Sequence, residues 1–326
     1  MRAKSVFASV GGAAVLSIPA LSILALSIAG LSAGCGGDSP AVFPQHLEIP
    51  VAPDPQPAPR AKPAAEPKSE AAPSPPPAAT DDASHPPVTA LTVTPEAAAI
   101  VAALDRTDAD RALDAGRHPG ELLTFLALEP GMHVAELVAG TGYTTELLAR
   151  AVGGPRDPGS KAGGKVWAEN PPAFLKFVGA PYKERLARPV MKSVARADRE
   201  LASPLPADAK GLDAVVSVLV YHDTVWLGID RDKMNKAVLD ALKKGGEYVI
   251  VDHSAAEGHS LDDVKTLHRI EEAAVEREVL RAGFERVASA NFLRNPDDAR
   301  DWNDSPTAAA DKRGTSDRFV LKFVKP

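Results

Sequence analysis

Residues 133–149, HVAELVAGTGYTTELLA, decide the fold of this chain. The apolar run 134–138 predicts a buried strand, residues 139–142 predict a turn, and residues 143–149 predict the start of an amphipathic helix. A strand, a glycine turn and a helix bring backbone N–H groups and a helix N-terminus close to a ligand. Glycine is favoured in such a turn because a Cβ would block the ligand or forbid the turn. The alternative is an ordinary strand–helix turn of another α/β domain.

The turn has the pattern acid-x-x-x-Gly-x-Gly, which begins at Glu136. It resembles the cofactor loop of class I S-adenosylmethionine (SAM) methyltransferases, whereas a dinucleotide site favours G-x-G-x-x-G, which is absent here. The resemblance implies SAM as the cofactor. The family usually has glycine at position 138, and a branched valine there is expected to narrow the pocket or reshape the turn. The cofactor-binding residues implied in this stretch are Glu136, Val138, Ala139, Gly140, Thr141, Gly142 and Tyr143.

Six further stretches predict strands: 165–168, 193–197, 213–220, 247–251, 286–292 and 319–324. Helices are predicted from 95, with Thr94 as N-cap and Pro95 at the first helical position, and over 232–242 and 261–281. The segments that precede the strands at 133 and 247 also resemble the corresponding segments of the methyltransferase family. The resemblance implies an α/β, Rossmann-like methyltransferase fold. Its sheet would be seven-stranded and mostly parallel, with an antiparallel terminal strand and helices on both faces.

In this family, an acid at the end of the second strand binds the ribose hydroxyls of SAM. Matching the strand ends places Asn170 at that position, with Glu169 beside it. An amide can hydrogen-bond a diol, but without the charge that strengthens the bond. Asp198 follows the third strand, where the family has an acid near the adenine amine. A plain turn residue is the alternative for Asp198.

Two strand ends carry histidine and aspartate side by side, at His222-Asp223 and at Asp252-His253. Ligands of open α/β sheets bind at the carboxyl ends of the strands, and these two strands are neighbours in the methyltransferase order. Methyl transfer to O–H or N–H requires a base, and histidine suits that role near neutral pH. We expect His222 as the first choice for the base and His253 as the second, with either aspartate orienting a histidine or the acceptor.

The same four side chains could have other roles. Either histidine can instead cap its strand end through hydrogen bonds. The set could also ligate a divalent metal, but no i, i+4 histidine pair supports this, and no metal is assigned from the sequence.

Four short motifs resemble an uncharacterised bacterial group of predicted methyltransferases. They are Tyr221-His222-Asp223, Asp252-His253-Ser254, Leu267-His268-Arg269-Ile270 and Gly314-Thr315-Ser316-Asp317. The resemblance covers roughly residues 110–326. It implies the fold and the cofactor, but it does not identify the methyl acceptor.

The N-terminal third predicts export and tethering. Residues 1–34 have two early cations and then no charge, and 31–35 resemble a bacterial lipobox that ends at Cys35, the only cysteine of the chain. Residues 1–34 are therefore predicted as a lipoprotein signal peptide, residues 35–93 as a Pro/Ala-rich disordered linker, and residues 94–326 as the methyltransferase-like domain. The alternative is an uncleaved membrane-spanning anchor.

Composition limits the partners and the chemistry. A net charge of −6 and 5% aromatic residues argue against a nucleic-acid surface, and a single cysteine excludes an internal disulfide. The sequence predicts a lipid-anchored, extracytoplasmic methyltransferase that acts on a small-molecule or membrane-associated acceptor. Because SAM is cytosolic and positions 138 and 170 depart from the family, the rival hypothesis is an inactive binding module on the same fold.

Overall fold

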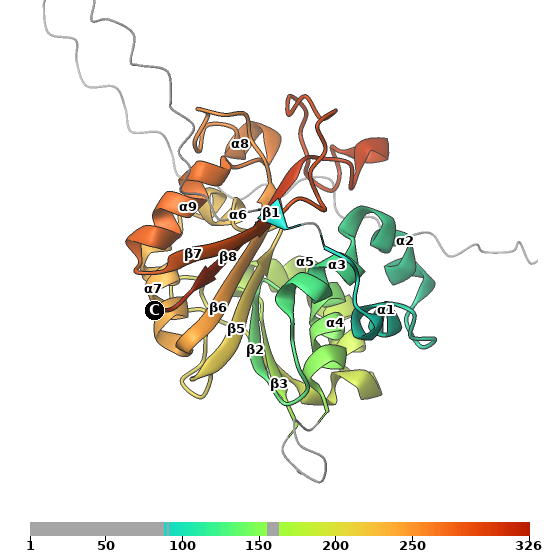
Figure 1. Ribbon diagram of the computed structural model, residues 1–326. Coiled ribbons are helices and arrows are strands. Elements are labelled where there is room, and N and C mark those ends of the chain that lie inside the picture. Colours follow the sequence, from blue (N-terminus) through green and yellow to red (C-terminus); the bar gives the residue numbers. More distant parts are fainter. Residues whose placement is uncertain (1–87, 90, 155–162) are drawn as a thin grey trace, which may run out of the picture. The chain divides into compact units, whose positions relative to one another are not determined.

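The structure is a computed structural model that describes residues 88–89, 91–154 and 163–326 (Figure 1). The predicted signal peptide, Cys35 and almost all of the predicted linker lie outside the described residues. Packing in the described part already begins before Thr94, because Leu91 and Val93 contact the hydrophobic core. Within these residues, no helix is both long and apolar enough to cross a bilayer.

A single mixed sheet organises the described chain. Its strands are β1 (Val88–Thr89), β2 (His133–Leu137), β3 (Lys165–Glu169), β4 (Val194–Ala197), β5 (Leu212–Val218), β6 (Leu242–His253), β7 (Glu285–Ala290) and β8 (Arg318–Val324). They lie in the order β1-β7-β8-β6-β5-β2-β3-β4. Only β8 is antiparallel to its neighbours β6 and β7. Apart from the two-residue edge strand β1, this is the predicted seven-stranded, mostly parallel Rossmann-like methyltransferase sheet, so the fold prediction is confirmed.

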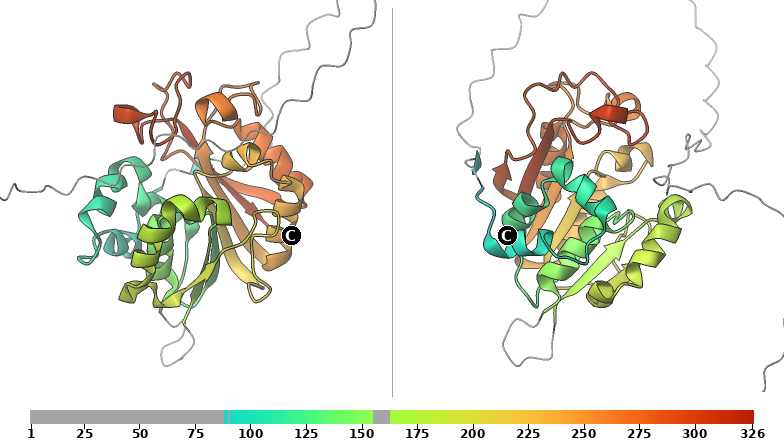
Figure 2. Two further views of the ribbon diagram at one scale, coloured as in Figure 1. Left: turned by 180° about the vertical axis from the view of Figure 1, so that it is seen from behind. Right: turned by 90° about the vertical axis from the view of Figure 1, so that its right-hand side faces the viewer.

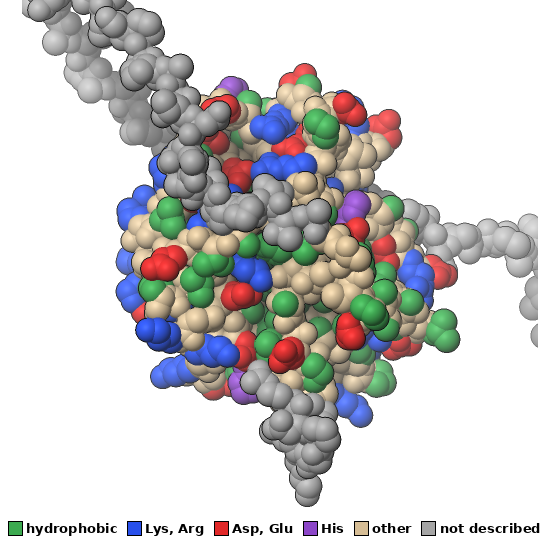
Figure 3. Space-filling model, viewed as in Figure 1, with side chains coloured by type: hydrophobic (Ala, Val, Ile, Leu, Met, Phe, Trp, Pro, Cys, Tyr) green, Lys and Arg blue, Asp and Glu red, His purple; other side chains and the backbone are tan. Residues whose placement is uncertain are grey.

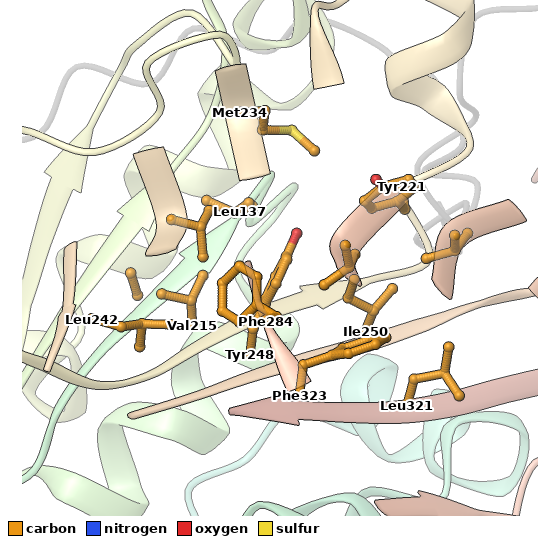
Figure 4. Close-up of a cluster of buried hydrophobic side chains, with 14 of the residues drawn as sticks. Leu137, Val215, Tyr221, Met234, Leu242, Tyr248, Ile250, Phe284, Leu321 and Phe323 are labelled. Carbon is orange, nitrogen blue, oxygen red and sulfur yellow. The ribbon is translucent and has the colours of Figure 1, made fainter. Parts of the chain in front are cut away.

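Helices cover both faces of the sheet (Figures 1 and 2). Along each central strand, alternate side chains enter one of two hydrophobic clusters. Val134 packs on the side of α1 (Pro95–Val101), α3 (Pro119–Leu126) and α4 (Tyr143–Val152). Leu137 packs on the side of α7 (Arg231–Ala241) and α9 (Glu272–Arg281). Figure 4 shows this second cluster, in which Tyr248, Ile250, Leu321 and Phe323 face the helices.

The remaining helices are α2 (Asp108–Arg117), α5 (Pro172–Leu186), α6 (Asp223–Trp226) and α8 (Val264–Leu267), with 3-10 turns at Pro189–Ser193 and Ala310–Lys312. The predicted start of α1 is confirmed, since Thr94 accepts a hydrogen bond from the Ala97 N–H at 3.2 Å. On the face shown in Figure 3, Lys and Arg side chains lie interspersed with Asp and Glu, so neither sign dominates the described part of that face.

One predicted helix was wrong in its extent. Residues 261–281 were expected to be continuous, but α8 ends at Leu267 and α9 begins at Glu272. His268 has a left-handed backbone, with φ +52°, and Ile270 forms a bridge with Ser254 at the end of β6. The bridge draws the chain back to the sheet edge and directs the residues around it toward the ends of the strands.

Candidate functional site

The glycine loop joins β2 to α4 and is open on one side. Gly140 and Gly142 both have left-handed backbones, with φ +58° and +86°, which glycine adopts without strain. A Cβ added to Gly140 would meet no described atom within 4 Å, whereas one added to Gly142 would lie 2.8 Å from Cδ of Arg185. The open space therefore lies over Gly140, and Gly142 lets α5 approach closely.

Val138, the position where the family usually has glycine, also has a left-handed backbone, with φ +52°. A β-branched residue is an outlier in that region. Leu219 stands just after the end of the neighbouring strand β5 and has φ +58°. Two adjacent central strands thus each end in a strained residue, a feature that is concentrated at functional sites.

The end of β3 is held against the glycine loop by two side chains. Oε2 of Glu169 accepts a hydrogen bond from the Val138 N–H at 3.0 Å. Asn170 makes two bonds with Gly140: its Oδ1 accepts from the N–H at 2.9 Å, and its Nδ2 donates to the carbonyl at 3.1 Å. Both predicted ribose-binding residues are therefore fully buried and fix the loop.

Glu169 nevertheless has one oxygen that no described residue hydrogen-bonds. Its Oε1 is buried and has no hydrogen-bond partner among the described residues. Burial raises the pKa of this carboxyl to about 8, although the Val138 N–H opposes the shift. A buried acceptor without a partner is destabilising, so a donor such as a ribose hydroxyl would be stabilised beside it. Together with the space over Gly140, this makes the loop and strand end a fit for SAM.

The other predicted cofactor residues hold the loop or lie away from it. Glu136 is buried and accepts a hydrogen bond from the Thr145 hydroxyl of α4, and burial raises its pKa to about 7. The Ala139 N–H donates to the Glu169 carbonyl at 2.7 Å. Tyr143 donates its hydroxyl to Asp114 at 2.7 Å. Asp198 is exposed and pairs with Arg196 at 2.7 Å.

A network of hydrogen bonds around one arginine holds the glycine loop in place. The sequence did not predict this network. Arg185 of α5 donates to the Thr141 carbonyl at 2.8 Å. It forms two hydrogen bonds to Asp110 of α2, at 2.6 and 2.8 Å, and one to Glu146 of α4 at 2.7 Å. One side chain therefore connects α2, α4 and α5 to the loop.

The predicted catalytic residues of β5 and β6 do meet. The ends of these parallel strands are in register, with Val218 opposite Val251. Nδ1 of His222 lies 2.7 Å from Oδ1 of Asp252, and the His222 backbone N–H donates to the other carboxylate oxygen at 2.8 Å. Nε2 of His222 faces Asp223 at 3.3 Å. Both ring nitrogens of His222 therefore face carboxylates.

His253 is oriented by residues from the loop before β8. Its Nδ1 lies 2.9 Å from the Ser316 hydroxyl and contacts the Asp304 carboxylate. Its ring lies 5.6 Å from the ring of His222, edge to face. No hydrogen bond to Nε2 of His253 is found in the described part of the chain, so this nitrogen is available to an acceptor.

His268 completes the cluster and was not among the predicted site residues. Its ring lies 5.5 Å from that of His222 and stacks on Trp226 at 5.3 Å. The available signals in the sequence were the motifs at 267–270 and 314–317, which indicated the family resemblance and no role for His268. The structure places His222, His253, His268 and Ser316, one residue from each of the four motifs, in a single cluster.

Burial and neighbouring charges give the three histidines different pKa values. Burial disfavours a charged His222, but Asp252 and Asp223 outweigh burial and raise its pKa to about 9. Burial, assisted by the other two histidines, lowers the pKa of His268 to about 4. Burial also lowers the pKa of His253, against the opposing effect of Asp304. At neutral pH the cluster thus contains one charged ring and two neutral rings.

Comparisons with known proteins found similarity to solved structures alone. No protein-family model matches the chain, and no curated protein matches it. Among solved structures it is similar to a SAM-dependent methyltransferase from Aquifex aeolicus, at 17% identity over 68% of this chain and 100% of that one, with a TM-score of 0.45. It is also similar to the glycopeptide N-methyltransferase MtfA complexed with sinefungin, at 17% identity over 65% and 93% of the two chains, with a TM-score of 0.43. A third, the [4+2]-cyclase SpnF, is 16% identical over 67% and 81%, with a TM-score of 0.45. The order and directions of strands β2 to β8 themselves define the fold of this chain as methyltransferase-like.

Proposed function

We propose that this chain binds SAM over residues 138–142 and transfers the methyl group to a small-molecule or membrane-associated acceptor held at the histidine cluster. The observation that carries the proposal is the buried, unpartnered Oε1 of Glu169, a residue that bonds the same loop in which Gly140 faces open space. Glu169 would accept a ribose hydroxyl, and the N-terminus of α4 would face the ligand. Bound SAM would supply a methyl group activated on a sulfonium.

We assign the proton acceptor to His253 rather than to His222, the first choice from the sequence. Both nitrogens of His222 face carboxylates, whereas Nε2 of His253 has no partner among the described residues. Asp304 and Ser316 fix the other nitrogen of His253 and so orient the ring toward an acceptor. This is the arrangement that general-base catalysis requires.

Calorimetric titration of the full-length protein with SAM and with its demethylated product tests the cofactor. Methyl transfer to lipid and small-molecule extracts then tests the base. We expect His253→Ala to lower turnover about 10²–10⁴-fold and to leave SAM affinity unchanged. His259→Ala is the matched control, because His259 is exposed and pairs only with Asp263 of its own segment. Equal turnover in both variants would remove His253 from the mechanism.

The second candidate function is an inactive extracytoplasmic binding module. It is favoured by Asn170, which already occupies the N–H and carbonyl of Gly140, and by the cytosolic location of SAM. This module would show no turnover, and the histidine variants would change only ligand affinity or stability. If the wild type binds no SAM at millimolar concentration, the enzyme proposal is abandoned for this one.

We also propose that the domain is held on the outer side of a bacterial membrane by a lipid on Cys35. The support is the sequence 31–35 and the uncharged run before it. An acceptor dissolved in or attached to that membrane would then lie within reach of the tether.

A further inference from the structure

Three side chains at the carboxyl edge of the sheet are spaced as ligands of one ion. They are His222, Asp223 and His268, and their ligand atoms all lie within 4.8 Å of one another. His222 and Asp223 stand at the end of β5 and the start of α6. His268 comes from the break between α8 and α9, more than forty residues later.

The distance between His222 and Asp223 fits an intervening ion better than a hydrogen bond. Nε2 and Oδ1 are 3.3 Å apart. A charge-assisted hydrogen bond is about 2.7–2.9 Å long, and the other nitrogen of His222 makes one of 2.7 Å to Asp252. Two atoms that each lie about 2.1 Å from a tetrahedral ion are about 3.4 Å apart. Nδ1 of His268 lies 4.0 Å from the same Asp223 oxygen, so a small ring movement completes the set.

The surroundings hold these ligands in place. Asp252 accepts from Nδ1 of His222 and so turns Nε2 toward Asp223, the partnership that metal-binding histidines commonly have. Trp226 stacks on His268, and its indole N–H is anchored to the Val264 carbonyl at 2.9 Å. The side chains of Asp223 and His268 are 23% and 24% exposed, so an ion could reach them from solvent.

The charge of the site also favours a cation. In the described part of the chain, the ion pairs of Asp223 and Asp252 are with histidines alone. By contrast, the buried aspartates nearby have arginine partners, as Asp298 has Arg269 and Asp317 has Arg294 and Arg300. Among the described residues, the only positive charge between these two carboxylates is the proton on His222, and a divalent ion that displaces the Nε2 proton would stabilise both of them.

We propose that His222, Asp223 and His268 bind one divalent first-row transition-metal ion, with its remaining positions open to solvent or a ligand. Two imidazoles and a carboxylate suit Fe²⁺ or Zn²⁺, and open positions are the mark of a catalytic rather than a structural site. The ion would bind an oxygen or nitrogen of the acceptor beside His253. The inference goes beyond the proposed function and holds whether or not residues 138–142 bind SAM.

The test is a titration of metal-stripped, full-length protein with Co²⁺, followed by visible absorption, with stoichiometry from elemental analysis and competition by Zn²⁺. We expect one equivalent per chain. His268→Ala and the isosteric Asp223→Asn should each weaken binding by at least about 100-fold, and Asp252→Asn by about 10–100-fold. Circular dichroism shows whether each variant is folded, and two independent ligand variants protect the test against one that is not.

His259→Ala is the control, because His259 and Asp263 form an exposed histidine–carboxylate pair 2.8 Å apart. It should leave Co²⁺ binding unchanged. The proposal is overturned if the folded wild type binds no Co²⁺ at millimolar concentration, if the ligand variants bind as the wild type does, or if His259→Ala removes the site. The titration contains no SAM, so its result is independent of the calorimetric one.

Discussion

At the scale of single residues, the backbone conformation of Val138 leads us to expect an unusual order of stability for its glycine and alanine variants. At most positions alanine is more stable than glycine by about 0.5–1 kcal/mol. Val138 has φ +52°, a region that disfavours any Cβ, so the order should reverse and Val138→Gly should be more stable than Val138→Ala. Chemical denaturation of both variants measures the difference. Alanine more stable than glycine would mean that this backbone relaxes in solution.

The Val138→Gly variant also gives a prediction for SAM affinity. Val138→Gly should bind SAM as well as the wild type or more tightly, because the substitution restores the family residue without disturbing the N–H that Glu169 accepts.

Replacing Glu169 is expected to change the stability of the fold and the affinity for SAM in opposite directions. Its folded pKa of about 8 lies above the ordinary value of 4.5, so the folded state holds a proton that the unfolded state has lost between those pH values. The free energy of unfolding contributed by this group therefore falls as pH rises from about 4.5 to 8. Glu169→Gln removes that titration, and its stability relative to wild type should grow by up to about 1.4 kcal/mol per pH unit.

Above about pH 8, where Glu169 is ionised, the same Glu169→Gln variant should bind SAM more weakly, since it loses the carboxylate that would accept a ribose hydroxyl. Urea denaturation at several pH values and calorimetry provide the two measurements. Glu129→Gln, on an exposed side chain of the turn before β2, is the control. A stability difference that does not change with pH would place the titrating group elsewhere.

Sequence reasoning found part of this site for a clear physical reason. His222, Asp223, Asp252 and His253 follow two apolar runs, and the ends of parallel neighbouring strands must meet. His268 and Asp304 could not be found in that way, because they reach the cluster through irregular segments whose path no periodicity encodes. The bonds of Glu169 and Asn170 to the loop were equally inaccessible, since they depend on the register of β2 against β3.

At the scale of elements, α5 is attached to α2 through a buried ion pair. The side chains of Arg185 and Asp110 are 14% and 6% exposed. Arg185→Met leaves Asp110 buried without its partner, which typically costs about 3–5 kcal/mol. We expect a loss near the lower value by urea denaturation, together with weaker SAM binding, because the Thr141 carbonyl also loses its donor.

Arg281→Met is the comparison for that experiment. Its partner Asp232 and Arg281 itself are both more than half exposed, and exposed pairs contribute little, so stability should not change measurably. A small effect of Arg185→Met would show that solvent reaches the Asp110 carboxylate. Adding Asp110→Asn to Arg185→Met should recover part of the loss if the two residues act as a pair.

The break between α8 and α9 shows why one predicted element was wrong. Residues 261–281 have few turn signals, so a continuous helix was the reasonable expectation. The bridge from Ile270 to Ser254 and the burial of Arg269 against Asp298 override local helix propensity. These contacts join segments far apart in sequence, and a local pattern cannot report them.

At the scale of the whole molecule, the apolar runs predicted the strands, and the resemblance to the methyltransferase family supplied their arrangement in the sheet. The central parallel strand β5 comes from a nearly continuous apolar segment, residues 213–220. Strand β1 was not predicted, because its two residues lie in a Pro/Ala-rich stretch that resembles a linker. Its pairing with β7 is a property of the assembled sheet and not of its own composition.

The proposed lipid anchor has a testable consequence for the location of the protein. Cys35 should carry lipid, and Cys35→Ala should release the protein from the membrane or misplace it, because the acyl chains supply the membrane affinity. Mass spectrometry of the N-terminal peptide and membrane fractionation measure both. An unmodified Cys35 in a chain that still begins at Met1 would favour a membrane-spanning anchor instead.

The place of β8 gives the sheet an order of assembly. β8 lies between β6 and β7, yet it follows both in the sequence. Until residues 318–324 have been synthesised, β6 has an open edge and β7 has no long strand beside it. Open edges invite pairing with other chains, and incomplete folds of this kind are prone to aggregate. For the export that we propose, the same delay would be useful, since a sheet that closes late would leave the chain extended while it passes through a translocation channel.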